Sequence, residues 1–372
     1  MKIGVFAERI GSAGGGVETY ELGLIKGLMN IDRDNHYTIY FSSECFCMEN
    51  LCNNTNFVFK SVNEKSKVLR FIIGIPYKLL TNKEDIVHVC SIPPLFNPRK
   101  YVMTVHDLCS FIHREFFPWQ IRQRLNYFLT KGIQNAAKII TVSESTRKDL
   151  IELFGIHPSK LSVIHLGLDR QYRPVEDKNA VRLTLDKYGI PPNYILYIGK
   201  IQSRKNIIGL LQVFYILKNK YKVPHKLVMV GRSLWNTKRE FQEIERLGIK
   251  DDVIQTGHVP YSDLPAMYSG ADVFVFPSFY EGFGLPPLEA MACGVPVVTS
   301  NTTALPEVLG DAALMDFPTN VEGLAQKVFL LLNDEHLRNT MREKGLKRAS
   351  LFSWEETARK TLDVYKDLYH DN

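Results

Sequence analysis

The stretch Glu281-Gly282-Phe283-Gly284-Leu285-Pro286-Pro287-Leu288-Glu289 places two carboxylates around a glycine-rich turn that opens a helix. Residues 271–277 precede it as a short apolar run, rich in β-branched and aromatic residues, which predicts a buried parallel strand. The chain then leaves the sheet at its carboxyl edge, where open α/β sheets bind ligands. We expect unpaired amides at the helix start, where anions bind, and they belong to Gly282, Phe283, Gly284 and Leu285.

The helix that follows brings the second carboxylate back towards this turn. Pro286 and Pro287 suit the first helical positions, because a missing N–H group costs nothing there, and Gly294 ends the helix. Helical side chains lean towards the N-terminus, so Glu289 is expected to reach the pocket that Glu281 faces. Taken singly, Glu281 is explained as a loop residue and Glu289 as a carboxylate favoured by the helix dipole. Their spacing favours a shared site.

The wider segment resembles a known enzyme family. Glu281 and Glu289 with seven residues between them, the Gly-Phe-Gly-Leu-Pro core and the run that continues to Val298 resemble the retaining glycosyltransferases of family 4. The resemblance extends to Thr256-Gly257-His258-Val259 upstream and Leu305-Pro306-Glu307-Val308 downstream. It implies an α/β protein of GT-B architecture, with two Rossmann-like domains facing across a cleft. It also implies transfer of a hexose from a nucleotide sugar with retained anomeric configuration.

Length and composition are typical of a globular protein with two domains. The chain has 372 residues, which is too many for one typical core, and its 45% hydrophobic and 23% charged residues are ordinary values. No apolar run is long enough to span a membrane, and residues 1–7 indicate a first strand rather than a signal peptide. The six cysteines suit neither a disulfide framework nor a zinc site. We therefore expect a cytoplasmic protein.

Alternating strand and helix patterns predict a parallel sheet in each half of the chain. By the resemblance, residues 1–170 form an N-terminal acceptor-binding domain, 171–190 a hinge, and 191–353 a C-terminal domain that binds the nucleotide sugar. A helix over residues 354–372 is expected to cross back to the first domain. The expected strands are residues 3–7, 37–41, 86–89, 101–105, 139–142 and 161–164, then 194–198, 227–230, 253–255, 273–276, 297–299 and a strand around 314.

A glycine-rich loop, residues 11–17, follows the first expected strand and suggests a dinucleotide site. It fails the G-x-G-x-x-G pattern, because Ala13 stands where the second glycine belongs if Gly11 is the first. A tight strand-to-helix turn explains such a loop equally simply. By the resemblance, amides in this loop approach the donor phosphates and shape the acceptor entrance, and Gly15 and Gly16 are the candidates.

A second candidate phosphate site follows the expected strand at 194–198. Arg204 and Lys205 offer a planar fork and a compact charge, respectively, to phosphate oxygens. Fixed cations of this kind lower the barrier when a diphosphate leaves. Surface Arg-Lys pairs are common, but Lys205-Asn206 after a strand and glycine matches the family pattern. Some relatives carry Arg where Lys200 stands, which leaves the role of Lys200 open.

His106 ends another expected strand, in Thr104-Val105-His106-Asp107-Leu108. An isolated histidine there is explained as a satisfied side chain at a sheet end. Mannosyltransferases of family 4 carry a similar segment, and the resemblance implies that His106 lies near the transferred sugar. Ser143 and Arg147 match a further family segment, although Ser143 is also a plain helix N-cap.

The resemblance assigns a role to each candidate. Arg204, Lys205 and the amides of residues 282–285 stabilise the diphosphate leaving group. Glu281 binds hydroxyl groups of the donor sugar, Glu289 the ribose hydroxyls, and the backbone near Val259 the base. No cofactor and no essential metal are expected, because cations and helix amides already serve the diphosphate and no D-x-D motif is evident.

GDP-mannose is the expected donor, on the resemblance of the His106 segment to mannosyltransferases of bacterial surface polysaccharide synthesis. UDP-glucose and UDP-N-acetylhexosamines are the alternative donors. The expected acceptor is a glycan or a lipid-linked saccharide. A UDP-sugar 2-epimerase shares the two-domain architecture, and an NAD-dependent oxidoreductase would use the first glycine loop. A non-catalytic subunit would lack Glu281 or the phosphate-binding cations, which this chain retains.

Two basic stretches interleaved with apolar residues occur at 60–80 and 114–131. Basic amphipathic helices with aromatic residues lie on anionic membranes, so peripheral contact with the inner face of the cytoplasmic membrane is one explanation. Core helices with solvated cationic faces are the other. Nucleic acid is not an expected partner, because the formal net charge is only +6 and the basic residues form no single dense patch.

Overall fold

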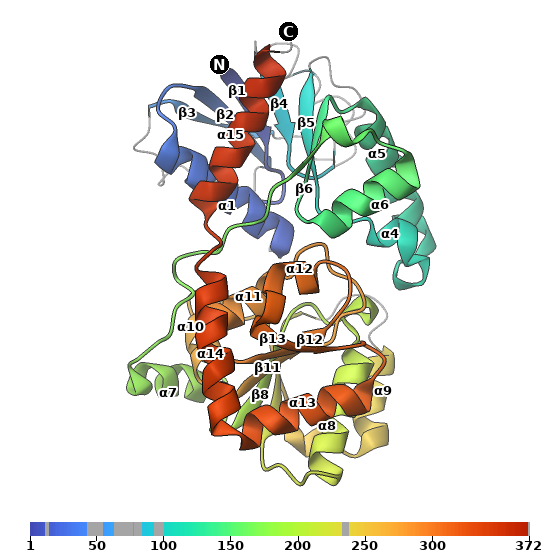
Figure 1. The fold of residues 1–372 in the computed structure, drawn as a ribbon, viewed down its shortest axis with the longest axis vertical. Coiled ribbons are helices and arrows are strands. Elements are labelled where there is room, and N and C mark those ends of the chain that lie inside the picture. The colour runs from blue at the N-terminus through green and yellow to red at the C-terminus, as the bar shows by residue number, and fades with distance from the viewer. Residues whose placement is uncertain are drawn as a thin grey trace. The chain divides into compact units, whose positions relative to one another are not determined.

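The computed structural model describes residues 1–11, 15–42, 55–62, 77, 84–92, 100–232 and 238–370 (Figure 1). The chain forms two compact units, of which unit 1 comprises Met1–Gly167 with Ser353–Asn372 and unit 2 comprises Leu168–Phe352. The range 171–190, assigned above to a hinge, lies in unit 2 and includes helix α7 (Lys178–Lys187). Within the described ranges, every helix is too short or too polar to cross a membrane.

Unit 1 is built on a seven-stranded parallel sheet with the order β3-β2-β1-β4-β5-β6-β7. Its strands are β1 (Lys2–Phe6), β2 (His36–Ser42), β3 (Phe57–Val62), β4 (Ile86–Val89), β5 (Tyr101–Val105), β6 (Lys138–Thr141) and β7 (Leu161–Val163). Its helices are α1 (Gly16–Ile31), α4 (Cys109–Ile112), η3 (Arg114–Phe116), α5 (Trp119–Asn135), α6 (Glu144–Phe154), η4 (Pro158–Lys160) and α15 (Trp354–His370).

Unit 2 is built on a six-stranded parallel sheet with the order β10-β9-β8-β11-β12-β13. Its strands are β8 (Tyr194–Ile198), β9 (Lys226–Val230), β10 (Val253–Gly257), β11 (Val273–Phe276), β12 (Val297–Ser300) and β13 (Ala313–Asp316). After α7, its helices are η5 (Ser203–Lys205), α8 (Ile207–Asn219), α9 (Lys238–Leu247), η6 (Lys250–Asp252), α10 (Leu264–Ser269), α11 (Leu285–Ala292), α12 (Leu305–Leu309), η7 (Gly310–Ala312), α13 (Val321–Asn333) and α14 (Glu335–Ala349).

Both sheets have the strand order of a doubly wound Rossmann fold. In each sheet, the first strand lies between the second and the fourth, so the order in which strands are added changes direction beside the first strand. This switch point lies between the neighbouring strands β1 and β4 in unit 1, and between β8 and β11 in unit 2. Ligands of open α/β sheets bind outside the carboxyl ends of the strands at such a switch point. The expectation of two Rossmann-like α/β domains is confirmed.

The apolar runs predicted the strands well, with one omission. The strands at 86–89, 101–105, 194–198 and 273–276 have the predicted bounds, and the bounds of the others differ by one or two residues. Strand β3, at the edge of the unit 1 sheet, is not among the predicted strands. Only Phe57 and Val62 of this strand are buried, whereas Val58 is half exposed, so β3 carries no continuous apolar signal.

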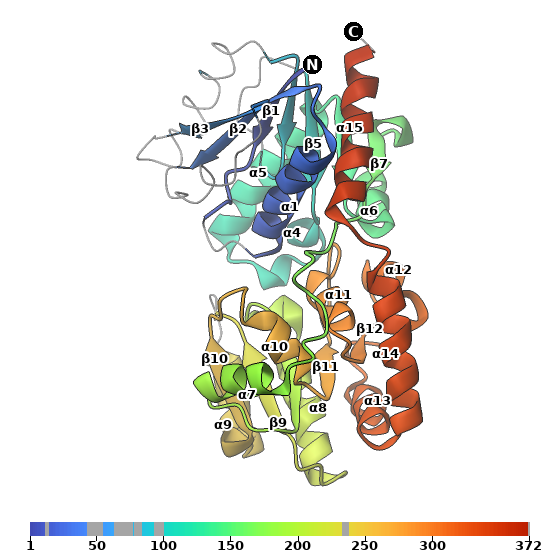
Figure 2. The same ribbon diagram turned by 90° about the vertical axis from the view of Figure 1, so that its left-hand side faces the viewer.

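Helix α15 completes unit 1 by packing along α1 (Figure 2). A Cβ atom on Gly23 would lie 2.1 Å from the indole ring of Trp354, and one on Gly27 would lie 2.4 Å from the Trp354 carbonyl oxygen. These two glycines on one face of α1 therefore make room for the start of α15. Further along, the Tyr365 hydroxyl is hydrogen-bonded to Nδ1 of His88 on β4, at 2.5 Å in the sheet interior.

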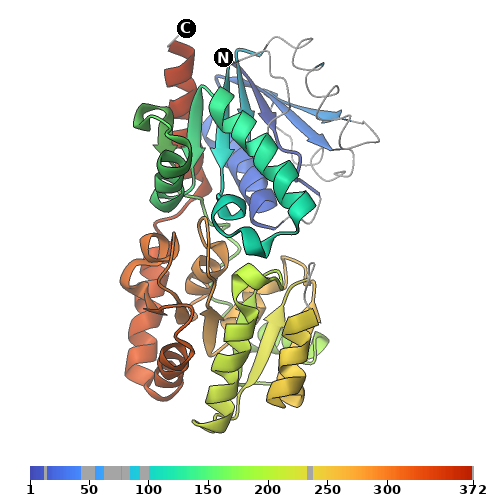
Figure 3. The ribbon, with the colours of Figure 1, turned by 90° about the vertical axis from the view of Figure 1, so that its right-hand side faces the viewer.

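Helix α5 covers part of one face of the unit 1 sheet (Figure 3). Its buried side chains, Leu129 and Ile133, belong to the same apolar core as Met103 and Val105 of β5. Trp119 and Tyr127 of the same helix are exposed. Helix α5 is therefore amphipathic, with one face in the core and an aromatic, basic face in solvent.

Candidate active site

The segments that follow β8 and β11 lie beside each other at the switch point of unit 2. The backbone N–H of Phe279 donates to the Arg204 carbonyl oxygen at 3.0 Å. In return, Nη1 of Arg204 donates to the Tyr280 carbonyl oxygen at 3.0 Å. Strand pairing of β8 with β11 and these two hydrogen bonds hold the cation-bearing segment against the carboxylate-bearing segment. The structure thus brings together the two motifs that the sequence analysis placed in one site.

Arg204 and Lys205 both face the carboxylate of Glu281. Nζ of Lys205 forms an ion pair with Oε1 of Glu281, and Nη1 of Arg204 lies 3.6 Å from Oε2. The ammonium also lies 4.8 Å from the ring centroid of Phe276, as in a cation–π contact. Burial alone would raise the pKa of Glu281, but Lys205 and then Arg204 outweigh it and hold the pKa below its ordinary value. Glu281 is therefore ionised at neutral pH.

The loop after β12 holds the Glu281 segment in place. The Glu281 N–H donates to Oγ1 of Thr303 at 3.0 Å, and Oγ1 of Thr302 donates to the Phe279 carbonyl oxygen at 3.2 Å. Thr303 has a φ of 52°, a left-handed conformation that is rare for a β-branched residue and marks local strain. Neither threonine is among the predicted site residues, because short hydroxyl side chains in a loop carry no periodic signal.

The glycine-rich turn leads into α11 as the sequence pattern indicated. Gly284 has a φ of 103°, and a Cβ atom there would lie 2.7 Å from Cδ2 of Leu305, so a glycine is required twice over. Pro286 occupies the first turn of the helix and has no N–H group. The amides of Gly282, Gly284 and Leu285 donate to no acceptor among the residues that the structure describes. These amides are available to an anionic ligand.

Glu289 occupies a different environment from Glu281. It lies in α11, is almost fully buried, and its Oε2 accepts a 2.8 Å hydrogen bond from the Tyr268 hydroxyl on α10. Burial raises the pKa of Glu289 to about 7, and Asp169 adds to the rise, whereas the hydroxyls of Tyr268 and Tyr172 oppose it. Glu289 therefore titrates near neutral pH, and hydroxyl groups rather than cations favour its ionised form.

Val259 lies in the segment after β10, on the same carboxyl edge but further along the sheet. The ends of β9 and β10 are hydrogen-bonded to each other, since the Gly231 N–H donates to the Gly257 carbonyl oxygen at 2.8 Å. Gly231 has a φ of 144°, and a Cβ atom there would lie 2.0 Å from the Gly199 carbonyl oxygen. The glycines thus permit close approach of three strand ends. Val259 itself is buried.

His106 lies in unit 1, directly after β5. Its Nε2 is 2.8 Å from the Cys90 carbonyl oxygen, and its ring meets that of Tyr20 edge-on at 4.9 Å. Burial lowers the pKa of His106, so the ring is neutral at neutral pH. A carbonyl oxygen only accepts, so Nε2 carries the proton and Nδ1 the lone pair. No hydrogen bond to Nδ1 comes from the described part of the chain.

Two carboxylates hold the start of the glycine-rich loop of unit 1. Oε1 of Glu18 accepts from the Gly11 N–H and Oε2 of Glu21 from the Arg9 N–H, both at 2.8 Å. These two amides are therefore taken by the protein itself. Gly15 precedes α1 with a φ of 74°, which favours glycine, and a Cβ atom on Gly16 would meet no atom of the described residues within 4 Å. Residues 12–14 lie outside the described ranges.

The remaining candidates have local roles. Ser143 is the N-cap of α6, because its Oγ accepts from the Thr146 N–H at 3.1 Å, and Arg147 pairs with Glu144 at 3.2 Å on the surface. The Lys200 carbonyl oxygen accepts from the Tyr197 hydroxyl at 3.1 Å. Within the described ranges, no cluster of three or more His, Cys, Asp or Glu side chains suits a metal ion. The basic stretch at 60–80 lies almost wholly outside those ranges.

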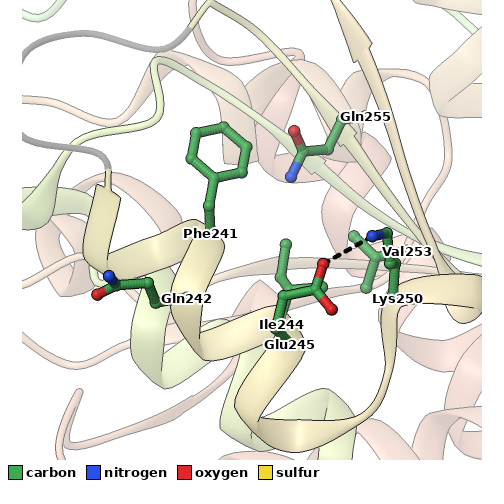
Figure 4. A pocket seen from close by; sticks show the side chains of 7 residues that line it. All are labelled: Phe241, Gln242, Ile244, Glu245, Lys250, Val253 and Gln255. Carbon is green, nitrogen blue, oxygen red and sulfur yellow. Dashed lines mark ion pairs between the residues drawn. The ribbon is translucent and has the colours of Figure 1, made fainter.

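A separate pocket of about 410 Å³ lies between α9 and the edge strand β10 (Figure 4). Phe241 and Ile244 of α9 and Val253 of β10 give it an apolar lining, and Nζ of Lys250 pairs with Oε1 of Glu245 at 2.7 Å beside it. None of the candidate residues lines this pocket. The pocket is therefore distinct from the site at the β8–β11 switch point.

Comparisons with known proteins agree with this architecture. The family described as "Glycosyltransferase Family 4" matches residues 14–172, and the family "Glycosyl transferases group 1" matches residues 185–348. O-antigen chain mannosyltransferase B of Escherichia coli is 38% identical over 267 residues, which cover 71% of this chain and 70% of that protein. The serotype-specific mannosyltransferase WbdA of Escherichia coli is 29% identical over 286 residues, which are 76% of this chain but only 35% of WbdA.

Solved structures show the same fold at low sequence identity. Sucrose-phosphate synthase of Thermosynechococcus elongatus superposes with a TM-score of 0.79 at 20% identity and covers 100% of both chains. HepE of Anabaena in complex with UDP-glucose gives a TM-score of 0.79 at 18% identity, over 99% of this chain and 100% of HepE. Together with the family matches, these likenesses show that the chain is a glycosyltransferase of family 4 with the GT-B fold.

Proposed function

We propose that this glycosyltransferase moves mannose from GDP-mannose to a glycan or lipid-linked saccharide, with retention of the anomeric configuration. The observation that carries the proposal is the cluster of Arg204, Lys205 and Glu281 beside the open amides of Gly282, Gly284 and Leu285. The names of two similar proteins, both mannosyltransferases, support the choice of sugar.

The cluster suits a departing nucleoside diphosphate. Within the trio, two positive charges face one negative charge, so the balance attracts an anion. Arg204 is the more accessible cation, with 20% of its side chain exposed against 8% for Lys205. Its planar guanidinium offers two parallel donors to phosphate oxygens. Lys205 and the amides of the turn add fixed positive charge where negative charge develops as the sugar–phosphate bond breaks.

The two carboxylates of the motif suit the two hydroxyl-rich parts of the donor. Glu281 is ionised and fixed by its cations and by Thr303, so it is a rigid acceptor for hydroxyl groups of the mannose. Glu289 is surrounded by hydroxyl donors, and the ribose hydroxyls are donors of the same kind. The backbone near Val259 then binds the base. This division of roles uses no cofactor and no essential metal.

In unit 1, His106 has one ring nitrogen, Nδ1, that is hydrogen-bonded by none of the described residues. Because Nε2–H is committed to the Cys90 carbonyl oxygen, the neutral ring presents Nδ1 as an acceptor. We infer that Nδ1 accepts a hydrogen bond from a hydroxyl group of the sugar being transferred. A neutral ring of this kind orients the sugar without competing for the phosphate charge.

A thermal-shift panel tests the donor. Purified protein is heated with GDP-mannose, UDP-glucose, UDP-N-acetylglucosamine and ADP-glucose, and a ligand that binds only the folded state raises the melting temperature. We expect the largest rise with GDP-mannose, and loss of that rise in Arg204→Ala. The matched control Arg359→Ala removes an exposed arginine of α15 that pairs with Glu356. A larger rise with a UDP sugar would overturn the mannose donor, and turnover of a UDP sugar without acceptor would favour an epimerase.

Product analysis tests the mechanism. With GDP-mannose and a mannose-terminated acceptor, NMR of the purified product identifies the anomeric configuration of the new glycosidic bond. Retention gives the α-mannoside from the α-linked donor. A β-mannoside would contradict the proposed stereochemistry and leave the donor assignment intact.

We also propose that the protein works at the inner face of the cytoplasmic membrane through the outer face of α5. Trp119 and Tyr127 are 62% and 54% exposed, and the same helix carries Arg122, Arg124 and Lys131. Exposed aromatic side chains interleaved with cations suit an anionic interface. In vesicle sedimentation, the protein should bind phosphatidylglycerol and not phosphatidylcholine. The double variant Trp119→Ala with Tyr127→Ala should not bind, whereas Tyr215→Ala on α8 should bind normally. Equal binding by the wild-type protein and both variants would exclude α5 as the membrane contact.

A further inference from the structure

The two carboxylates of the candidate site are stabilised by opposite means. Glu281 has two cations beside it, Lys205 and Arg204. Glu289 has the Tyr268 hydroxyl at 2.8 Å and the Tyr172 hydroxyl facing it. Tyr268 is fully buried, so its hydroxyl has no competing bulk water. This difference indicates that the protein controls the two carboxylates separately.

We propose that Tyr268, supported by Tyr172, is a positioning residue that keeps the Glu289 carboxylate charged and oriented for the donor nucleotide. The proposal rests on the proposed function, because it takes Glu289 to be the ligand of the ribose. Tyr268 bonds to Oε2, and a carboxylate has about four lone-pair sites, so Glu289 can accept ribose hydroxyls beside both tyrosines. The neighbouring tyrosine ring fixes Tyr268 in turn, since the two rings meet edge-on with centroids 6.0 Å apart.

A phenol acts on Glu289 differently from the cations beside Glu281. Lys205 and Arg204 hold the Glu281 carboxylate ionised, whereas a phenol adds no charge of its own. A phenol offers a weaker hydrogen bond of the same type as a ribose hydroxyl, so the carboxylate can accept both. As a consequence, the pKa of Glu289 lies near neutral pH, so a small change in its surroundings changes the ionised fraction of the carboxylate.

The groups that face Glu289 come from three elements. Tyr268 belongs to α10, Tyr172 and Asp169 to the segment before α7, and Cys293 follows Glu289 at the end of α11. Burial and Asp169 raise the pKa of Glu289, and the two tyrosines lower it, to a net value of about 7. Removal of either phenol therefore raises the pKa further. In every form of the protein, donor affinity should fall as the pH decreases and Glu289 takes up a proton. The midpoint of this fall should lie at a higher pH in the variants than in the wild-type protein.

The test is the affinity for GDP-mannose, measured without acceptor by calorimetry at about pH 6.5 and about pH 8.5. GDP-mannose is used because its phosphates do not change charge over this range. In Tyr268→Phe the pH midpoint should rise by about one unit, the size expected for one hydrogen bond to an ionised carboxylate. Affinity should fall about tenfold at the lower pH and less than about twofold at the higher pH.

Three further variants make the outcome decisive. Tyr172→Phe should shift the midpoint in the same direction by less, and it serves if Tyr268→Phe does not fold. Glu289→Gln should bind weakly with no pH dependence in this range. Tyr188→Phe is the matched control, because it removes a 2.6 Å hydrogen bond from a tyrosine to Asp263 outside the site. It should bind as the wild-type protein does.

The outcomes separate the inference from the proposed function. Equal loss of affinity at both pH values in Tyr268→Phe, or no loss at either, overturns the positioning role while the donor site stands. Normal binding by Glu289→Gln overturns both the ribose assignment and the inference built on it. Absence of GDP-mannose binding by the wild-type protein overturns the proposed function itself.

Discussion

Lys205 and Glu281 form an ion pair whose side chains are only 8% and 6% exposed. Removing the cation would leave a buried carboxylate with Arg204, at 3.6 Å, as the one cation beside it within the described ranges. Lys205→Met should therefore lower the free energy of unfolding by about 3–5 kcal/mol, as measured by urea denaturation, and abolish turnover. Lys220→Met is the control, because Lys220 and Glu322 form an exposed pair and its loss should leave the free energy of unfolding nearly unchanged.

A double substitution separates the structural role of this pair from its chemical role. Lys205→Met with Glu281→Leu replaces both charges with apolar groups, which is often neutral for stability. We expect the double variant to recover most of the lost free energy of unfolding and none of the activity. Substantial turnover by the double variant would show that the pair is a structural feature only, and the proposed active site would fail.

The Thr303 hydroxyl should matter to catalysis although it is not expected to touch the substrate. Thr303→Ala removes the acceptor for the Glu281 N–H and leaves that amide unpaired, which should lower kcat by about tenfold. Thr303→Ser keeps the hydroxyl and should retain most of the activity. Both variants lose the β-branch at the same φ of 52°, so backbone strain does not distinguish them. Equal rates in steady-state assays of the two variants would exclude this role.

His88 should make unit 1 sensitive to acid. Burial, with a smaller contribution from His106, lowers the pKa of His88 to about 3, below the ordinary value of 6.5. As pH falls below about 6.5, the unfolded chain takes up a proton and the folded chain does not, so stability declines until about pH 3. His88 contributes a slope of up to about 1.4 kcal/mol per pH unit in this window.

Urea unfolding across that pH window isolates this contribution. His88→Gln should remove part of the slope, because glutamine takes up no proton in this window. Glu21 acts in the opposite direction, because burial raises its pKa and favours the protonated carboxyl group in the folded state. The difference between variants, rather than the wild-type slope alone, is therefore the quantity to compare. Parallel slopes for wild type and His88→Gln would contradict the prediction.

The close contact between α1 and α15 should tolerate no side chain at Gly23. The added methyl group of Gly23→Ala would meet the Trp354 ring at 2.1 Å, and overpacking of this kind typically costs about 1–3 kcal/mol. Gly16→Ala on the same helix is the control, because its methyl group meets no atom within 4 Å among the residues that the structure describes. Thermal unfolding compares them, and an unchanged melting temperature in Gly23→Ala would refute the packing argument.

The sequence predicted those parts of the molecule that a local pattern encodes. Buried parallel strands are continuous apolar runs, so β8 and β11 were predicted with their bounds, whereas the half-exposed edge strand β3 was not. The Glu281–Glu289 motif and the Arg204-Lys205 pair likewise stand in local patterns, and the structure places Arg204, Lys205 and Glu281 together.

What the sequence could not predict are contacts between distant side chains without periodicity. Tyr268 and Glu289 are 21 residues apart, and nothing in either segment identifies the other as its partner. Thr303 is equally unmarked, because its importance depends on the backbone amide of Glu281 and on an unusual φ. The proton on Nε2 of His106 follows from one carbonyl oxygen of a neighbouring strand end. The catalytic roles of these residues stay predictions for the experiments above.

Helix α15 has a consequence for how the chain is made. Unit 1 begins at Met1 but is completed only by residues from Ser353 onward, so the ribosome finishes all of unit 2 before the last helix of unit 1 emerges. Until then the notch at Gly23 and Gly27 has no Trp354 to fill it. A nascent chain that stalls before Trp354 would expose the apolar face of α1 that α15 normally covers. We expect chaperones or proteases to recognise such a chain.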